Sequence, residues 1–477
     1  MDLSQKLEGI SAVKWALLDR FGSQIILLAN TIILARLLSP RDFGLISILY
    51  IFMNISSAFV DSGMGGGLIR KQSLSDIDCS TFFLFNVGVA LIFYVGLYML
   101  APVVAQFYQE PLIVILLRLL SITIVINSFA LIQKVLLIKN LKFKYVTRSS
   151  LFASFFSTAV AIFCAWKGLG IWSLIILQLC QSMVNVCLLW LYCNWMPRFQ
   201  FSKSSFLEMY AFGAGLFFTS IVNLVFANIY QPIIGKFFSV SSSGYFYQAK
   251  RLYEVPVLSI SSVVDSVTYP ILVKYQSDIK ELAGNYQKLI KLLVFVVIPL
   301  TVSISLLSRS IVLILLGQKW LFSAQLLRIL SFSGIFLILE TINGSILKVQ
   351  GRTKLIFKLE LFKKLIIIVN IVIFCQFGLT ALVYGVVINS VISFMINQLF
   401  NNLSLGNYKN LLIFLINGGV MAVAMFIIMR LIDNSYAALL ISTVVGFSVY
   451  FLLGYLLKLQ EQRWLYLIVS KKLRPVA

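Results

Sequence analysis

Long runs of apolar residues follow one another along almost the whole chain, with only short polar segments between them. Most runs reach about 20 residues, the length that a helix needs to cross a hydrocarbon core of roughly 30 Å. The pattern predicts fourteen membrane-spanning helices, at residues 13–38, 43–67, 79–101, 112–137, 147–167, 169–195, 208–232, 244–270, 286–309, 322–350, 355–376, 379–402, 408–430 and 434–457. No segment between them is long enough to fold as a soluble domain, so we expect an all-α polytopic membrane protein.

Lys and Arg residues concentrate in alternate loops. With a cytoplasmic N-terminus, about 27 of the 39 fall in cytoplasmic loops, tails and flanks, about 7 fall outside and about 5 lie within spans, as the positive-inside rule predicts. We therefore expect a multi-pass membrane protein with both termini in the cytoplasm.

Two pairs of segments indicate an internal repeat. FVDSGMGGGLIR at 59–70 aligns with VVDSVTYPILVK at 263–274, and KVLLIKNLKFK at 134–144 aligns with KVQGRTKLIFK at 348–358. Each pair falls at the corresponding loop of a six-span unit, and an even number of crossings makes the two repeats parallel. The prediction is two six-helix lobes and an appendage, at 1–200 (spans 1–6), 201–405 (spans 7–12) and 406–477 (two additional spans and a basic tail).

The composition narrows the functional class. The chain is 60% hydrophobic and 12% charged, and its net charge of +22 lies in loops rather than on a soluble surface, so we expect no nucleic-acid partner. Histidine is absent, and the six cysteines lie mostly within apolar runs without metal-ligand spacing. The sequence therefore predicts no metal site, no disulfide framework and no bound cofactor.

Three motifs carry a resemblance to a known family. They are ARLLSPRDFGLIS at 35–47, KNLKFKY at 139–145 and GYFYQAKRLYEVP at 244–256. In these segments the chain resembles the polysaccharide-transporter branch of the multidrug/oligosaccharidyl-lipid/polysaccharide exporter superfamily, the Wzx-type O-antigen or capsule repeat-unit flippases.

This resemblance implies two lobes around a central cavity that opens alternately to each side of the membrane. It implies movement of an undecaprenyl-pyrophosphate-linked oligosaccharide from the cytoplasmic to the periplasmic leaflet, for O-antigen, capsule or exopolysaccharide synthesis. Cavity arginines would receive the pyrophosphate. The implied partners are this lipid-linked substrate, membrane lipids, and the polymerase and glycosyltransferases of the same pathway.

Charged residues within spans are costly unless they face water, a partner or a ligand. The candidate substrate-binding cations are Arg20, Arg118, Lys250, Arg251 and Arg328. Arginine suits phosphate because its planar donor fork binds two oxygens at once. Two alternatives stay open: Arg20 anchors the first helix beside Asp19, and Arg118 and Arg328 extend to the periplasmic head groups.

The segment 244–270 is the most charged of the predicted spans. Lys250 and Glu254 are four residues apart and share a helix face, whereas Arg251 is rotated by about 100°. A structural Lys–Glu pair is one interpretation, and it leaves Arg251 as the cation for the substrate. Pro256 follows this cluster, and we expect it to kink the helix.

Acidic residues supply candidates for ion coupling or gating, with H⁺ or Na⁺ as the coupled ion: Asp61, Glu254, Asp265 and Glu340. Asp61 and Asp265 lie near the cytoplasmic ends of their spans, where hydration or a neighbouring Lys or Arg is the alternative explanation. Glu340 lies deep in its span and is the strongest candidate.

Two other functions compete with the flippase. An ion-coupled multidrug or cation antiporter of the same superfamily would favour an acidic and aromatic cavity, whereas the cations found here suit an anionic substrate. A membrane enzyme such as a polymerase or ligase would need a large external loop and a catalytic residue set. The sequence shows neither, so we expect a transporter and not an enzyme.

Overall fold

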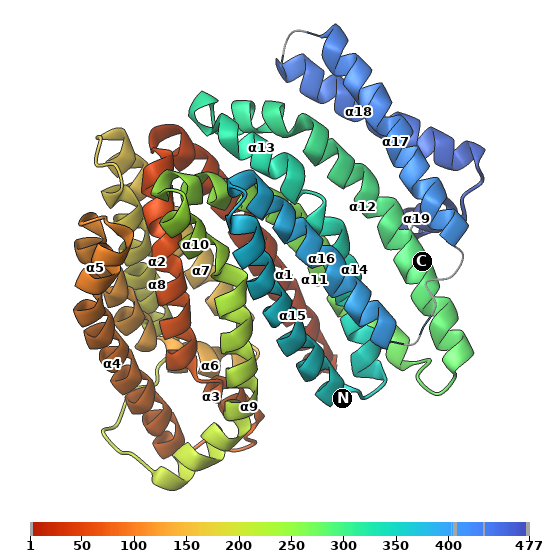
Figure 1. Ribbon diagram of the computed structural model, residues 1–477. Helices are drawn as coiled ribbons and strands as arrows, with labels where there is room; N and C mark the ends of the chain where they lie inside the picture. The colour runs from red at the N-terminus through yellow and green to blue at the C-terminus, as the bar shows by residue number, and fades with distance from the viewer. Residues whose placement is uncertain (1–2, 402, 404–407, 433–434, 474–477) are drawn as a thin grey trace. The chain divides into compact units, whose positions relative to one another are not determined.

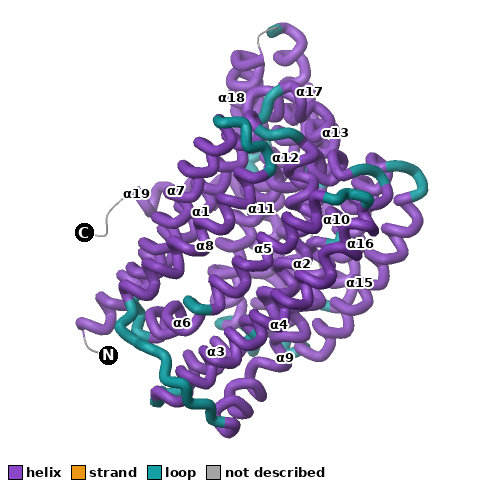
Figure 2. Tube along the Cα trace, turned by 90° about the vertical axis from the view of Figure 1, so that its left-hand side faces the viewer, coloured by secondary structure: helices purple, strands orange, loops and turns teal. Residues whose placement is uncertain are grey.

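The computed structural model describes residues 3–401, 403, 408–432 and 435–473. Helices joined by loops make up this described part of the chain, and no strand occurs in it (Figure 2). Packing divides the chain into two compact units, unit 1 at Met1–Gly244 and unit 2 at Tyr245–Ala477. The predicted all-α class is therefore confirmed. The predicted lobe boundary at 200/201 stays a prediction.

Unit 1 contains the first ten helices (Figure 1). In chain order they are α1 (Leu3–Leu37), α2 (Pro40–Asp61), α3 (Met64–Arg70), α4 (Asp76–Tyr108), α5 (Leu112–Ser128), α6 (Leu131–Lys139), α7 (Phe143–Trp166), α8 (Trp172–Tyr192), α9 (Lys203–Asn228) and α10 (Tyr230–Phe237). Helix α11 (Val240–Val273) begins at the end of this unit and runs into unit 2.

Unit 2 contains the remaining helices. They are α12 (Ile279–Leu315), the 3-10 turn η1 (Gln318–Trp320), α13 (Leu321–Leu330), α14 (Ser333–Val349), α15 (Thr353–Cys375), α16 (Leu379–Phe400), α17 (Tyr408–Leu431), α18 (Ser435–Leu456) and α19 (Gln460–Leu473).

By length and composition, nine helices in the described residues can cross a membrane, or ten if one bent pair counts as a single span. The chain is thus a multi-pass membrane protein, whereas the count of fourteen stays a prediction. The physical reason for part of the difference is charge: α11 contains Lys250, Arg251 and Glu254, and α15 contains Lys363 and several other charged residues. A helix with several charged residues does not qualify as a long, nearly uncharged apolar stretch, so α11 and α15 are not among these nine helices.

A short turn interrupts the helix within four of the predicted spans, although Pro40–Arg70 and Leu112–Lys139 each still qualify as one membrane span. Segment 43–67 forms α2 and α3, 112–137 forms α5 and α6, 208–232 forms α9 and α10, and 322–350 forms α13 and α14, the last pair bent by 43°. Between α2 and α3 the backbone of Gly63 has a φ of 69°, a conformation that glycine adopts without steric cost. Hydrophobicity along the chain carries no mark of such breaks.

Two of the family-like motifs meet in unit 1, where the start of α2 crosses the start of α11. A Cβ added to Gly44 would lie 1.9 Å from the carbonyl oxygen of Val240, and one added to Gly244 would lie 1.9 Å from that of Pro40. The hydroxyl groups of Ser47 and Ser243 are hydrogen-bonded at 2.9 Å. Both glycines are required here, because no side chain fits between backbones this close.

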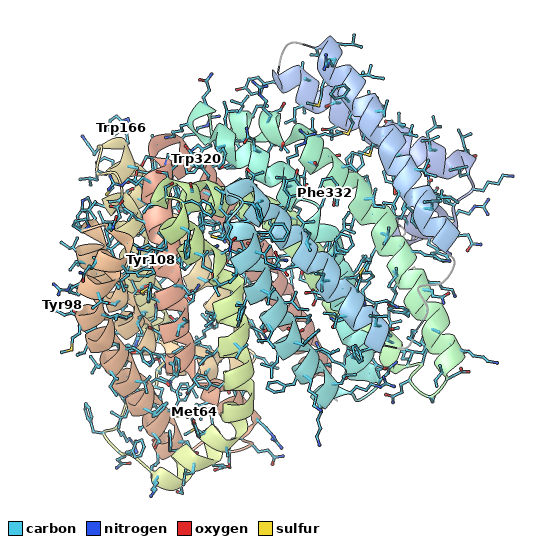
Figure 3. The ribbon with its side chains drawn as sticks, viewed as in Figure 1. Met64, Tyr98, Tyr108, Trp166, Trp320 and Phe332 are labelled. Carbon is cyan, nitrogen blue, oxygen red and sulfur yellow. The ribbon has the colours of Figure 1, made fainter. Side chains whose placement is uncertain are left out.

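Unit 2 is organised around α12, the longest helix. Helices α17 and α18 lie against it (Figure 1). The Tyr450 hydroxyl of α18 donates to the carbonyl oxygen of Phe295 at 3.0 Å, and Phe414 packs on the Phe295 ring. At the other end of the unit, the fully buried Trp320 packs edge-on against Tyr245 (Figure 3). The two spans predicted as an appendage are thus packed onto α12.

Candidate functional site

A polar cavity lies within unit 1, where α5, α6, α7 and α8 meet. Its volume is about 320 Å³. Polar side chains dominate its lining, and the lining residues are Asn127, Ala130, Leu131, Lys134, Ser150, Ala153, Gln178, Gln181, Ser182, Asn185 and Leu189. Polar groups in such number inside a membrane-spanning bundle need partners, water or a ligand.

Helix α8 provides most of the amide groups, because Gln178, Gln181, Ser182 and Asn185 recur at the spacing of one helix face. Neighbouring helices hold two of these side chains. The Gln178 amide nitrogen donates to the Tyr50 hydroxyl at 2.8 Å, and the Gln181 amide nitrogen donates to Ser154 Oγ at 3.2 Å. The side chains of Gln178 and Gln181 are therefore held in place without a ligand.

Lys134 of α6 is the cation of this cavity. It lies close enough to Asp61, the last residue of α2, for its charge to act on the Asp61 carboxylate. Asp61 is exposed. On the opposite wall, Ser150 donates a hydrogen bond to the Asp19 carboxylate of α1. Among the described lining residues Lys134 is charged and none is a carboxylate.

Unit 2 contains a buried ion-pair cluster around Lys363 of α15. The Lys363 side chain is 3% exposed, and its ammonium group donates to Glu340 Oε1 of α14 at 2.6 Å and to Glu360. Asn397 of α16 donates to the same Glu340 oxygen at 3.4 Å. The candidate coupling residue Glu340 thus already has a cation beside it.

The charged segment of α11 also lies in unit 2. Lys250 Nζ and Glu254 Oε1 are 3.6 Å apart, as the spacing of these residues along the helix predicts. Arg251 is half-buried, and its Nε is a buried donor without a hydrogen-bond partner in the described part of the structure. Helix α11 continues through Pro256.

Arg328 is exposed on α13, and its position is fixed by a contact to its backbone. Ser305 Oγ of α12 donates to the Arg328 carbonyl oxygen at 3.1 Å. A cavity of about 340 Å³ here is lined by Arg328 and Arg309, with Gln325 and Ser308 beside them. The sequence analysis did not select Arg309, although a second arginine next to Arg328 doubles the positive charge available to an anion.

Arg118 lies apart from the other predicted residues. Its guanidinium carbon is 3.9 Å from the centre of the Tyr98 ring, and its Nε donates to the Tyr98 carbonyl oxygen at 3.3 Å. Tyr98 projects from the outer side of α4 (Figure 3). Both interpretations of Arg118, as a cavity cation and as a head-group contact, stay predictions. The side chains of Arg20 and Asp265 lie outside the described residues, so their roles stay predictions.

The sites described here provide binding groups rather than a catalytic set. Among the described residues, no group of three or more His, Cys, Asp or Glu side chains is arranged to hold a metal ion. The amides of α8 were missed from sequence because only charged residues were considered. The signal was present: polar residues at positions i, i+3, i+4 and i+7 mark one face of an otherwise apolar span.

Comparison with known proteins places this geometry in a family. The family described as "Polysaccharide biosynthesis protein" matches residues 33–325. The chain belongs to this family. The match contains the first and last of the family-like motifs at 35–47 and 244–256, and it confirms the resemblance to polysaccharide transporters.

Two related proteins can be aligned with most of this chain. The teichuronic acid biosynthesis protein TuaB of Bacillus subtilis is 26% identical over 350 residues, 73% of this chain and 72% of TuaB. The lipopolysaccharide biosynthesis protein WzxC of Escherichia coli is 23% identical over 408 residues, 83% of this chain and 82% of WzxC.

Two solved structures share the fold. The lipid II flippase MurJ, in an inward closed conformation, superposes with a TM-score of 0.77 at 17% identity, over 93% of this chain and 98% of MurJ. A multidrug resistance transporter of the MATE family, in an inward-facing conformation, superposes with a TM-score of 0.63 at 15% identity, over 80% of this chain and 93% of that chain. At these identities the likeness shows the fold alone.

Proposed function

We propose that this family member is a flippase for an undecaprenyl-pyrophosphate-linked oligosaccharide repeat unit. It moves the unit from the cytoplasmic to the periplasmic leaflet of the bacterial inner membrane by alternating access, with both termini in the cytoplasm. The product serves O-antigen, capsule or exopolysaccharide synthesis. The observation that carries the proposal is the family match over residues 33–325.

The names of its relatives support the proposed substrate class. They include proteins of teichuronic acid and lipopolysaccharide biosynthesis, together with a succinoglycan biosynthesis transport protein of Rhizobium meliloti. The fold of the lipid II flippase supports a lipid-linked cargo. In this proposal the protein transports and does not catalyse, needs no cofactor, and works beside the glycosyltransferases and polymerase of its pathway.

The charge pattern favours an anionic cargo over the cationic cargo of an antiporter. In unit 2, Glu340 and Glu360 are neutralised by Lys363, and Glu254 is paired with Lys250. A cationic substrate would have to displace these lysines. In contrast, Arg309 and Arg328 line a cavity whose described lining residues include no acidic side chain, which suits phosphate oxygens.

The test replaces Arg20 and Arg251 by Gln, singly and together, in a strain that lacks the chromosomal gene. Each loss of a charged donor should lower surface polysaccharide roughly tenfold, because a hydrogen bond to a charged group contributes about 1.5–3 kcal/mol. The control is Arg430→Gln, at the exposed end of α17, which should leave export unchanged. Wild-type polysaccharide levels in the double variant would disprove the role of these cations.

We further propose that transport is coupled to H⁺ or Na⁺ through Glu340. Glu340→Gln should weaken the dependence of transport on an ion gradient in proteoliposomes. Glu360→Gln is the matched control, because Glu360 pairs with the same lysine. Equal changes in both variants would assign the effect to Lys363 and remove Glu340 from the coupling scheme.

A further inference from the structure

The side chains that line the polar cavity of unit 1 are not those expected of a phosphate-binding site. Its amide groups come from Asn127, Gln178, Gln181 and Asn185, and among the described lining residues Lys134 is the one cation. A pyrophosphate site would need more donors with positive charge, such as the arginine forks that bind phosphate oxygens in pairs. The cavity therefore suits a ligand that is polar and largely uncharged.

An amide matches a pair of neighbouring hydroxyl groups. Its NH₂ group donates while its carbonyl oxygen accepts, and each hydroxyl of a sugar ring both donates and accepts in the same way. Four amides converge here with Ser150, while Leu131 and Ala153 provide apolar surface for the C–H groups of a ring. This mixture of convergent polar groups and apolar lining is typical of small-molecule sites.

One atom in the wall is left without a partner. The Oδ1 of Asn185 is buried and makes no hydrogen bond in the described part of the structure. A buried acceptor without a partner costs about 1–3 kcal/mol. Gln178 and Gln181 are held by Tyr50 and Ser154, so Asn185 is an amide of this face whose hydrogen-bonding capacity is not used up by its neighbours.

The size of the cavity limits the ligand. About 320 Å³ is at the small end of the range for ligand sites, roughly 300–1,000 Å³. A single ring fits this volume, whereas a whole repeat unit does not. A cationic ligand is disfavoured by Lys134 and by the absence of a lining carboxylate, and an apolar ligand would leave the amides unpaired.

We propose that this cavity binds one sugar ring of the lipid-linked oligosaccharide and so discriminates between repeat units that differ in that sugar. The proposal rests on the proposed flippase function. It assigns sugar recognition to the amide face of α8, separately from the arginines that would receive the pyrophosphate.

The experiment measures the affinity of the purified protein in lipid nanodiscs for two probes. One is undecaprenyl pyrophosphate without sugar, and the other is undecaprenyl pyrophosphate carrying the repeat unit of the source strain. The variant is Gln181→Met with Asn185→Leu, which keeps side-chain volume and removes the amides. Gln133→Met is the matched control, because Gln133 is a fully buried amide of unit 1 outside the cavity lining.

The wild-type protein should bind the glycosylated probe roughly tenfold more tightly than the bare lipid, since two hydrogen bonds of ordinary strength amount to that factor. The double variant should lose this preference while it binds the bare lipid as before, and that binding also reports correct folding. Asn185→Leu alone should show part of the same loss. Gln133→Met should keep the full preference.

A preference that survives in the double variant would overturn the sugar site and leave the flippase function standing. An equal loss of affinity for both probes would also overturn it, because the amides would then act on the lipid part. If the wild-type protein bound neither probe, the proposed flippase function itself would fail, and the sugar site with it.

Discussion

Each unit contains a lysine that bridges two carboxylates from different parts of the fold, and the two bridges differ in burial. In unit 1, Lys71 follows α3 and lies 3.1 Å from Asp78 of α4 and 3.0 Å from Glu208 of α9. In unit 2, Lys363 of α15 bridges Glu340 and Glu360. The Lys71 side chain is 25% exposed, and its partners Asp78 and Glu208 are 3% and 63% exposed. The Lys363 side chain is 3% exposed, and its partners Glu340 and Glu360 are 27% and 29% exposed.

Salt bridges with the same arrangement of charges contribute differently to stability, depending on how far their side chains are buried. Water and salt screen an exposed pair, so it contributes little to stability. A buried pair gains little over apolar residues of the same size, yet loss of one partner leaves an uncompensated charge in a medium that solvates it poorly. The bridge at Lys363 is therefore the more vulnerable of the two: its loss would remove the cation from two carboxylates, whereas Asp78 beside Lys71 would keep the hydrogen bond that it accepts from the Ser75 backbone.

The largest expected effect is that of Lys363→Met. Two carboxylates would lose their cation. Removal of one partner from a fully buried pair costs about 3–5 kcal/mol, and partial hydration of Glu340 and Glu360 lowers the cost here. Thermal unfolding of the detergent-solubilised protein should show a clear fall in melting temperature. The control is Lys364→Met, whose ammonium lies 3.6 Å from Glu360; since Lys363 still neutralises Glu360 there, its effect should be much smaller.

The triple variant that adds Glu340→Gln and Glu360→Gln to Lys363→Met should recover most of the lost stability, because neither carboxylate would then remain without its cation. Equal melting temperatures for the single and triple variants would mean that Lys363 stabilises unit 2 through packing and not through charge.

A smaller effect is expected for Tyr286→Phe, in a second buried polar cluster of unit 2. The Tyr286 hydroxyl lies 2.6 Å from both Asn343 Oδ1 and Gln398 Oε1, and it accepts a hydrogen bond from Asn401 at 3.1 Å. Its removal leaves buried groups unsatisfied at a cost of about 1–3 kcal/mol. Tyr450→Phe, which removes one hydrogen bond to a backbone carbonyl, is the control and should cost less in the same unfolding measurement.

The smallest effect is that of Lys71→Met, at most about 1 kcal/mol, because Glu208 is largely exposed and the buried Asp78 keeps its hydrogen bond from the Ser75 backbone. Hydrogen bonding to Glu208, with a contribution from Asp78, raises the pKa of Lys71 above its usual value. A lysine with a raised pKa stabilises the fold fully below its unfolded pKa, and this stabilisation is lost as the pH rises through the folded pKa. The stability gap between wild type and variant should therefore close as the pH rises above about 10. A gap that stays constant across this range would show that the charge of Lys71 makes no contribution.

Local sequence patterns predicted some features well and others poorly. The spacing of Lys250 and Glu254 predicted their pairing, because residues four apart share a helix face whatever surrounds the helix. The pairing of Glu340 with Lys363 was not predicted, since these residues lie on different helices and only packing brings them together. The breaks within four predicted spans were missed for a similar reason: a turn such as that at Gly63 leaves no mark in hydrophobicity.

The sequence by itself determined that the chain is an all-α membrane protein of the polysaccharide transporter type. Apolar length and short motifs are local properties, and the motif glycines Gly44 and Gly244 specify a close helix crossing that no other residue allows. Tertiary structure alone decided which polar groups are satisfied and which are available. The Lys363 cluster neutralises itself, whereas the amides of α8 line a cavity, because the distances between helices, and not the order of residues, determine where polar groups meet.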